Sequence, residues 1–391
     1  MQSALPVRGD DLTNVQLGIV TVGRLSLITA FRILYPLLPF LSDQLNVDLT
    51  TISVLVTVQL LVSIVSPLGG MLADTRGERL TMLLGMGLFC IGALVCALGV
   101  TFAWFFVGYT LIGLGLAIYQ PAAQSYLSAR SSYARRGRAL GVFETSWAAA
   151  ALVGVFPLME LVQRTSSTSL TFWILLGVGI ASLLLMGLAL PPTPRHASAE
   201  RIPIDWAALR TQSAIAVLLF IGLVLMAYEV YLVAQASWLK DAFDADERTL
   251  GQIYGVVGIA ELIGSFGVIA FVDRIGKRRS VALSFALSAL LMLLLPFTAG
   301  NWVLLLIAVF CFYACIEFAI VAAIPLMSGV APTARGTLMA LSVAVVGVSR
   351  VGGAQISAPL YLSAGMLANA ALGATVMALS LLLLLRVREV E

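Results

Sequence analysis

Long apolar stretches separated by short polar segments dominate the chain. Twelve of these stretches are about as long as the 20 residues that a helix needs to cross the hydrocarbon core of a bilayer. They cover roughly residues 14–41, 49–73, 80–99, 102–128, 139–163, 169–190, 213–241, 249–272, 280–299, 302–329, 337–362 and 366–386. Because these stretches and their connections use nearly the whole chain, the pattern predicts an all-α membrane protein with twelve transmembrane helices.

The composition agrees with this prediction. Apolar residues make up 60% of the chain and charged residues 11%, far from the average of soluble domains. The first stretch is not typical of a signal peptide, because Arg8, Asp10 and Asp11 precede it and no small-residue cleavage site follows. We therefore expect this stretch to remain as the first span.

The distribution of Lys and Arg predicts the orientation. With the N-terminus inside, seventeen of these side chains face the cytoplasm, and only Arg164, Lys240 and Arg248 face out. Cytoplasmic loops carry the excess of positive charge in membrane proteins. The sequence therefore predicts a multi-pass protein of the inner (plasma) membrane with both termini cytoplasmic. The net charge of +3 then reflects orientation, and nucleic acid is not an expected partner.

Two charged loops, residues 74–79 and 273–279, repeat one pattern at an offset of 199 residues. Asp74 and Gly77 of the first loop correspond to Asp273 and Gly276 of the second, and residues 136–140 recur as 335–339 at the same offset. A shared offset close to half the chain length indicates two copies of one unit. We expect a six-helix bundle over 1–190, a Pro-rich cytoplasmic linker over 191–212 and a second six-helix bundle over 213–391. An even number of spans in each copy predicts that the copies run parallel.

The first loop also carries a family resemblance. The stretch Gly70-Met-Leu-Ala-Asp74-Thr-Arg-Gly77-Glu-Arg79 resembles the loop 2–3 signature of the major facilitator superfamily, Gly-x-Leu-Ala-Asp-Arg-x-Gly-Arg-Arg. The second loop matches the charged part of that signature, and the twelve spans, linker and repeat extend the resemblance over the whole chain. The resemblance implies two pseudo-symmetric six-helix bundles that rock around a central cavity, and hence secondary transport by alternating access.

In this family the loop 2–3 contact stabilises the outward-facing state, and the resemblance implies a cytoplasmic gate here. Its Asp is expected to cap a helix N-terminus of the other half, where the helix dipole favours an anion. The alternative is a turn that only sets the topology. The predicted gate residues are Gly70, Asp74, Gly77, Glu78, Arg79, Arg130, Asp273, Arg274, Gly276, Lys277 and Arg278.

The chain departs from the family pattern in several places. Glu78 stands where the family usually has a basic residue, and Arg130 lies where it often has an acid, so we expect Glu78 to pair with Arg130. The span 4 Arg of the drug/proton antiporter branch is missing from residues 109–113, and the span 5 signature is hardly recognisable in residues 147–157. The superfamily resemblance stands, whereas the resemblance to the twelve-helix drug/proton antiporter branch is weaker.

Seven charged residues lie within the spans, away from their ends. They are Arg24, Arg32, Glu144, Glu229, Glu261, Glu317 and Arg350. Each costs at least about 2.5–3.5 kcal/mol at a helix centre, so each should face protein or water and not lipid. None has a charged counterpart at the 199-residue offset. We therefore expect these residues to serve substrate binding and coupling, and the charge-free spans 3, 6, 9 and 12 to face lipid.

Depth in the membrane suggests partners for some of these charges. Glu261 and Arg350 lie near mid-membrane and are expected to pair, and Glu144 and Arg24 lie at a similar depth and are expected to pair likewise. Arg32, Glu229 and Glu317 are left without a partner. A buried, unpaired glutamate can load and release a proton near neutral pH. We predict Glu229 and Glu317 as proton carriers, with Glu261 and Glu144 as further coupling residues and Arg32 biasing one carrier or binding an anionic substrate group.

Helical spacing selects candidate cavity residues. Polar and aromatic residues form one-sided stripes in spans 4, 7, 8 and 10, with ordinary packing as the alternative explanation for each stripe. The predicted substrate cavity comprises Arg24, Arg32, Tyr109, Gln120, Gln124, Tyr228, Tyr231, Gln235, Trp238, Tyr313 and Arg350, and Tyr254 and Ser265 share a face with Glu261. Aromatic walls with few polar groups suit an amphipathic ligand.

The sequence gives no sign of an enzyme. The four cysteines lie in apolar stretches without metal-ligand spacing, the single histidine lies in a loop, and no nucleotide-binding loop is present. We expect no metal, no cofactor and no catalytic residue, so a gradient must supply the energy. The predicted function is proton-coupled export of an amphipathic small molecule by a monomer in the lipid bilayer. The alternatives are uptake of an organic anion, flipping of a lysolipid and, in another class, a membrane-embedded enzyme or a non-transporting receptor.

Overall fold

The structure is a computed structural model that describes residues 12–131, 133–191, 206–331 and 334–387. Throughout these ranges the regular elements are helical. The N-terminal half contains α1 (Asn14–Leu45), α2 (Leu49–Leu61), α3 (Ser66–Arg76), α4 (Glu78–Ala97), α5 (Phe102–Arg130), α6 (Tyr133–Ala149), α7 (Phe156–Thr165) and α8 (Ser169–Ala189). The C-terminal half contains α10 (Gln212–Phe243), α11 (Glu247–Ile275), α12 (Lys277–Leu294), α13 (Trp302–Ser328) and α14 (Arg335–Leu384). The short α9 (Trp206–Leu209) precedes them.

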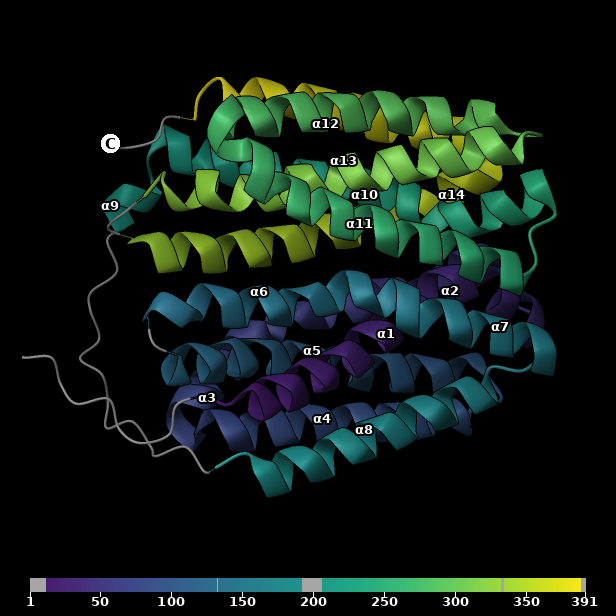
Figure 1. Ribbon diagram of the computed structural model, residues 1–391. Helices are drawn as coiled ribbons and strands as arrows, with labels where there is room; N and C mark the ends of the chain where they lie inside the picture. Colours follow the sequence, from purple (N-terminus) through teal and green to yellow (C-terminus); the bar gives the residue numbers. More distant parts are fainter. Residues whose placement is uncertain (1–11, 132, 192–205, 332–333, 388–391) are drawn as a thin grey trace, which may run out of the picture.

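The helices lie side by side along one axis, with the N-terminal half below and the C-terminal half above in Figure 1. In the described residues, eleven helices are long and apolar enough to cross a membrane. α14 covers the last two expected spans and is interrupted by the non-helical Gly365 (φ 73°, ψ 179°). The prediction of an all-α membrane protein is confirmed.

The two charged loops have the same backbone conformation. Gly77 joins α3 to α4 with φ 92° and ψ 146°, and Gly276 joins α11 to α12 with φ 90° and ψ 136°. The amide of each glycine donates to the carbonyl four residues earlier, that of Ala73 or Val272, at 2.9 Å. Positive φ with extended ψ is essentially restricted to glycine. The repeat at an offset of 199 residues is therefore structural as well as sequential.

Replacing Gly276 by alanine tests this requirement. The space around its Cβ position is open, so the expected loss of about 1–3 kcal/mol in unfolding free energy comes from backbone strain alone. Gly177→Ala is the matched control, because Gly177 lies in regular helix with open space at its Cβ position. Denaturant titration in detergent should show a lower unfolding free energy for Gly276→Ala but not for Gly177→Ala. An unchanged Gly276→Ala midpoint would contradict the conformational argument.

Two helices at the other end of the bundle are capped in the same way. Asp48 caps α2 by accepting from Thr50 and Thr51, and Asp246 caps α11 by accepting from the amide and hydroxyl of Thr249. The threonine side-chain hydrogen bonds favour the ionised carboxylate and lower the pKa of both aspartates. Each anion lies at the positive end of a helix dipole, which stabilises the start of the helix.

The span over α6 and α7 contains a π-helical segment, η2 (Ala150–Val155), for which α14 has no equivalent. η2 contacts both α1 and α11. A Cβ at Gly154 would collide with Thr29 of α1, and one at Gly258 of α11 would lie 2.9 Å from the Ala148 carbonyl oxygen. Glycines thus allow α1 and α11 to approach this segment closely, and π-helical turns often occur at functional sites.

The two halves are joined at the end of the bundle opposite the charged loops. Lys240 forms an ion pair with Asp43, Arg248 contacts Glu160 at 2.7 Å, and the amide of Glu247 donates to the side chain of Gln163 at 3.1 Å. We call this the closed end. The opposite end, which carries residues 74–79 and 273–279, is called the open end because a cavity extends from it between the halves.

Candidate functional site

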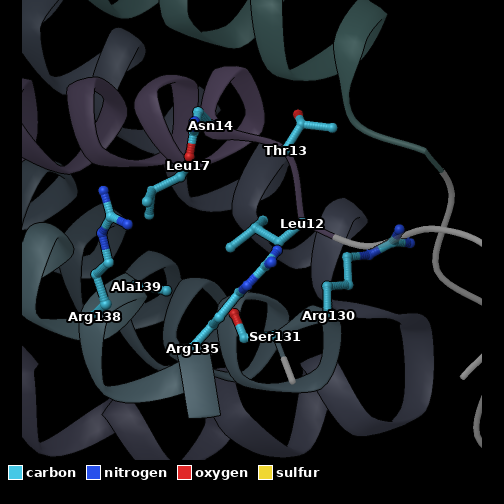
Figure 2. A pocket seen from close by; sticks show the side chains of 9 residues that line it. All are labelled: Leu12, Thr13, Asn14, Leu17, Arg130, Ser131, Arg135, Arg138 and Ala139. Carbon is cyan, nitrogen blue, oxygen red and sulfur yellow. The ribbon is translucent and has the colours of Figure 1, made fainter. Parts of the chain in front are cut away.

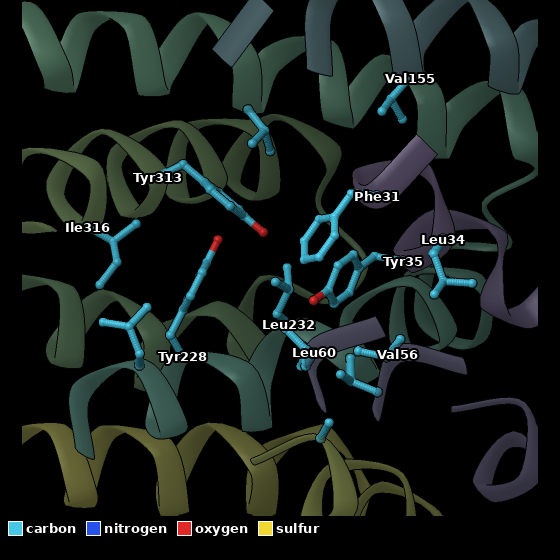
Figure 3. Close-up of a cluster of buried hydrophobic side chains, with 14 of the residues drawn as sticks. Phe31, Leu34, Tyr35, Val56, Leu60, Val155, Tyr228, Leu232, Tyr313 and Ile316 are labelled. Carbon is cyan, nitrogen blue, oxygen red and sulfur yellow. The ribbon is translucent and has the colours of Figure 1, made fainter. Parts of the chain in front are cut away.

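The cavity between the halves has a volume of about 830 Å³. α1, α6, α10, α11, α13 and α14 contribute its walls, which are mainly apolar and aromatic. In Figure 3 the hydroxyl groups of Tyr228 and Tyr313 point toward one another, and the rings of Phe31 and Tyr35 lie across from them. Both halves therefore supply side chains to one central space, which the helices of either half alone would not enclose.

The first polar cluster joins α1 to α11. Arg32 donates from both terminal nitrogens to Glu261, at 2.6 and 2.9 Å, and from one of them to the Trp147 carbonyl oxygen at 3.0 Å. Its guanidinium also lies over the Trp147 ring, 4.9 Å from the centroid. A bidentate arginine–carboxylate pair is among the strongest side-chain contacts. This pair connects the N-terminal half to the C-terminal half.

The second polar cluster surrounds Glu229 of α10, which is fully buried. Glu229 accepts from Arg350 Nε at 2.7 Å and from the Tyr35 hydroxyl at 2.7 Å. The Tyr35 hydroxyl in turn accepts from Arg350 at 3.0 Å. Because Tyr35 belongs to α1 while Glu229 and Arg350 belong to the C-terminal half, this cluster also connects the two halves.

The third cluster lies within the N-terminal half. Arg24 contacts Glu144 at 2.8 Å and also donates to the Phe143 carbonyl and the Ser146 hydroxyl. Gln124 donates to the other carboxylate oxygen of Glu144 at 3.1 Å. The predicted Arg24–Glu144 pair is confirmed.

Glu317 of α13 differs from the other acids within the spans. It lines the cavity and accepts a hydrogen bond from Ser265 of α11 at 2.9 Å. Among the described residues no basic side chain forms an ion pair with it. Each of the three arginines within the spans forms an ion pair with a glutamate. Glu317 is the fourth glutamate within the spans and has no arginine partner in the part of the chain that the structure describes.

Comparison with known proteins identifies the family. The sequence model of the family described as Major Facilitator Superfamily matches residues 20–236 and 219–391. The chain belongs to this superfamily. It is a multi-pass membrane protein and a secondary transporter, not an enzyme.

Two curated relatives illustrate the range of similarity to this transporter. The "Uncharacterized MFS-type transporter YwfA" of Bacillus subtilis (strain 168) is 24% identical over 343 residues, covering 85% of this chain and 82% of the relative. The "Lysophospholipid transporter LplT" of Serratia proteamaculans (strain 568) is 29% identical over 154 residues, covering 39% of this chain and 38% of that protein. The second match therefore reaches well under half of either protein.

Solved structures confirm the transporter fold. The human organic anion transporter MFSD10 (TETRAN) is 18% identical with a TM-score of 0.71, covering 95% of this chain and 100% of that chain. A D-xylose–proton symporter is 16% identical with a TM-score of 0.79, covering 96% of this chain and 98% of that one. At these identities the likeness concerns the fold alone. The finer resemblance to the drug/proton antiporter branch stays a prediction.

The transporter pairs its buried charges differently from the sequence prediction. The predicted Glu261–Arg350 pair is wrong, because Glu261 binds Arg32 and Arg350 binds Glu229. Arg32 and Glu229 were expected to lack partners, and this is also wrong. Matching by depth within one half misses a contact such as Arg32–Glu261, in which α1 meets α11 across the two halves.

The predicted cavity residues divide into two groups. The predicted residues that line the cavity are Arg24, Arg32, Tyr228, Tyr313 and Arg350, together with Tyr254, Ser265 and the acids Glu144, Glu261 and Glu317. Glu229 is instead enclosed behind Tyr35 and Arg350. The residues predicted to line the cavity that are not among its lining residues are Tyr109, Gln120, Gln124, Tyr231, Gln235 and Trp238.

Aromatic packing accounts for three of the six residues that do not line the cavity. Tyr109 packs against Phe172 with ring centroids 6.0 Å apart, Tyr231 against Phe312 at 5.2 Å and Trp238 against Phe243 at 5.8 Å. Gln235 accepts from the Tyr313 hydroxyl at 2.5 Å, which holds that ring in the cavity wall.

Several cavity-lining residues escaped the sequence prediction, and three of them are aromatic residues close to the buried charges. Phe31 and Tyr35 of α1 and Trp147 of α6 line the cavity. Tyr35 lies three residues after Arg32 and therefore on the same side of α1. The position of Arg32 could therefore have predicted that Tyr35 lines the cavity, whereas no spacing in the sequence predicted the same for Trp147.

The predicted gate loops lie at the open end. Asp74 is exposed and, among the described residues, has no hydrogen-bond partner. Arg79 donates to the Gly187 carbonyl, Arg274 and Arg278 are exposed, and Gly70 and Lys277 are partly buried. The side chain of Asp273 lies outside the described residues. Asp74 therefore does not cap a helix of the other half in this structure, as expected for a gate that closes in another conformation. The gate role stays a prediction.

The predicted Glu78–Arg130 pair is wrong for this structure. Glu78 is buried and accepts from the Ser125 hydroxyl at 3.2 Å, while its second oxygen has no hydrogen-bond partner. The Arg130 guanidinium lies over the Tyr126 ring, 4.7 Å from the centroid. Glu78 therefore contacts the Ser125 hydroxyl, and Arg130 contacts the Tyr126 ring, where the two side chains were expected to contact each other.

Proposed function

We propose that this transporter exports an amphipathic small molecule in exchange for protons by alternating access, with Glu317 as the proton carrier. The observation that carries the proposal is that Glu317, alone among the four glutamates within the spans, lines the cavity without an arginine partner among the described residues. With the predicted orientation, the open end faces the cytoplasm, and substrate enters there.

The cavity supports an amphipathic substrate. Its volume of about 830 Å³ lies within the range of about 300–1,000 Å³ for small-molecule sites. Aromatic and aliphatic side chains form most of its surface, and the buried arginines already bind glutamates. A strongly polar substrate would lose its hydration without gaining partners, whereas an apolar body with one charged group would be accommodated.

Glu317 supports the coupling. A carboxyl group in apolar surroundings releases its proton less readily than one in water. Its neutral form keeps the Ser265 hydrogen bond, and its charged form attracts a cationic group entering the cavity. A cation and a proton then compete for one carboxylate, which is the basis of exchange.

Flipping of a lysolipid is the second candidate, favoured by the partial match to lysophospholipid transporters. In this case the cavity would hold the acyl chain, and the headgroup would need basic partners near the open end. Dependence on a pH gradient distinguishes the two functions, because flipping does not require Glu317 to change its charge.

Ligand binding at several pH values tests the proposal. For purified protein in detergent, the affinity for a lipophilic cation such as tetraphenylphosphonium should rise with pH, by up to about tenfold per pH unit while Glu317 titrates. The sign follows because deprotonation creates the negative charge that the cation needs. A lipophilic anion should show the opposite trend. Cation affinity that does not depend on pH would contradict the exchange mechanism.

A further inference from the structure

A second pocket lies at the open end, outside the central cavity. It has a volume of about 330 Å³ and lies between the start of α1 and the turn from α5 to α6. We call it the arginine pocket, because Arg130, Arg135 and Arg138 line it together with Ser131 and residues 12–17. The amide of Leu12 donates to the Arg130 carbonyl at 3.0 Å, so the start of α1 is already attached to this turn.

The charge of the arginine pocket is not balanced by its own residues. No Asp or Glu is among its lining residues. Arg135 and Arg138 are both exposed, and neither forms a hydrogen bond or ion pair with another described residue. Figure 2 shows both side chains extending from α6 toward the start of α1. Like charges held close together repel, so the arrangement favours an anionic ligand.

Ser131 supplies an independent indication of a ligand. The residue is only 9% exposed, and its hydroxyl is buried without a hydrogen-bond partner although it lines the pocket. Buried polar groups are nearly always satisfied, so an orphan hydroxyl beside a cavity points to a missing acceptor. The N-terminus of the 32-residue α1 adds the positive end of a helix dipole on the opposite side.

We infer that the arginine pocket binds a phosphate group. Phosphate carries up to two negative charges and several acceptor oxygens, which matches guanidinium groups from Arg135 and Arg138 and a hydroxyl donor from Ser131. Arg138 also lines the central cavity. A phosphate bound here is therefore adjacent to the mouth of the transport path, and a chain attached to that phosphate can reach the apolar wall of the cavity.

Binding of three probes to the full-length protein in detergent tests this site, with native mass spectrometry as the readout. The probes are inorganic phosphate, lysophosphatidic acid, and the uncharged monoacylglycerol with the same chain. The site predicts binding of lysophosphatidic acid in preference to monoacylglycerol. The double variant Arg135→Gln/Arg138→Gln should weaken that binding at least about tenfold, because it removes charge-assisted hydrogen bonds.

Arg279→Gln/Arg386→Gln is the matched control. It removes two exposed positive charges that lie outside the pocket, and it should leave the affinity within about twofold. Ser131→Ala should reproduce part of the loss without any change of charge, which separates the pocket from general attraction to a basic surface.

The outcomes distinguish the source of the phosphate. Loss of binding of both inorganic phosphate and the lysolipid in the pocket variant would support a site for the free anion, and loss for the lysolipid alone would support a lipid headgroup site. Equal weakening in the pocket and control variants, or equal binding of monoacylglycerol, would overturn the inference. None of these measurements depends on a pH gradient or on Glu317, so this site and the proposed exchange mechanism fail or stand separately.

Discussion

Glu317→Gln should abolish substrate transport driven by a pH gradient while leaving the fold intact. Gln retains the shape and accepts from Ser265 as the carboxyl group does, but it cannot exchange a proton at any pH. A fall of at least about a hundredfold in gradient-driven flux is expected for a loss of the coupling group. The variant should also lose the pH dependence of cation binding.

Proteoliposomes with an imposed pH gradient provide the measurement. Glu247→Gln is the matched control, since it makes the same chemical change on the first turn of α11, outside the cavity lining. Glu317→Asp should recover part of the flux, because it restores a titratable group one methylene shorter. Gradient-driven flux at the normal rate in Glu317→Gln would show that another residue carries the proton.

The fold was predictable because the bilayer restricts it. Spanning segments must be helical and about 20 residues long, so apolar runs locate them directly. The repeat could also be predicted from the sequence. Gly77 and Gly276, at matched positions, both adopt the backbone conformation that is restricted to glycine. The boundary near residue 365 was also predicted from the sequence, although α14 continues as one element around Gly365.

The site was predictable only in part, because a sequence shows which residues are buried charges but not which helices meet. Arg32 and Glu261 are 229 residues apart, and they meet only because α1 and α11 come together beside η2. Nothing in the residues 150–155 marks a π-helical segment. Helical spacing likewise could not tell that Tyr109 faces Phe172 within its own half while Tyr228 faces the cavity.

Removing one member of the Arg32–Glu261 pair should have the largest effect on stability. Both side chains are almost inaccessible, at 7% and 4% exposure. Arg32→Met leaves Glu261 as an uncompensated charge, and Glu261→Met does the same to Arg32, so each single variant should lose about 3–5 kcal/mol of unfolding free energy. The double variant, which leaves no charge behind, should recover most of that loss.

Denaturant titration of the two single variants and the double variant in detergent measures this coupling. The exposed pair Lys240–Asp43, at 41% and 68% exposure, is the matched control and should contribute no more than about 1 kcal/mol. Additive losses in the Arg32–Glu261 cycle would show that the two groups act independently, contrary to the 2.6 Å contact.

Transport by the same double variant then shows whether the pair contributes only to folding stability or also to the conformational change of transport. The pair joins α1 of one half to α11 of the other, so the proposed rocking of the halves is expected to change its geometry. A double variant that folds normally but transports slowly would show that the ion pair contributes to the conformational change itself. A double variant that transports at the normal rate would restrict the role of the pair to neutralising two buried charges in the cavity wall.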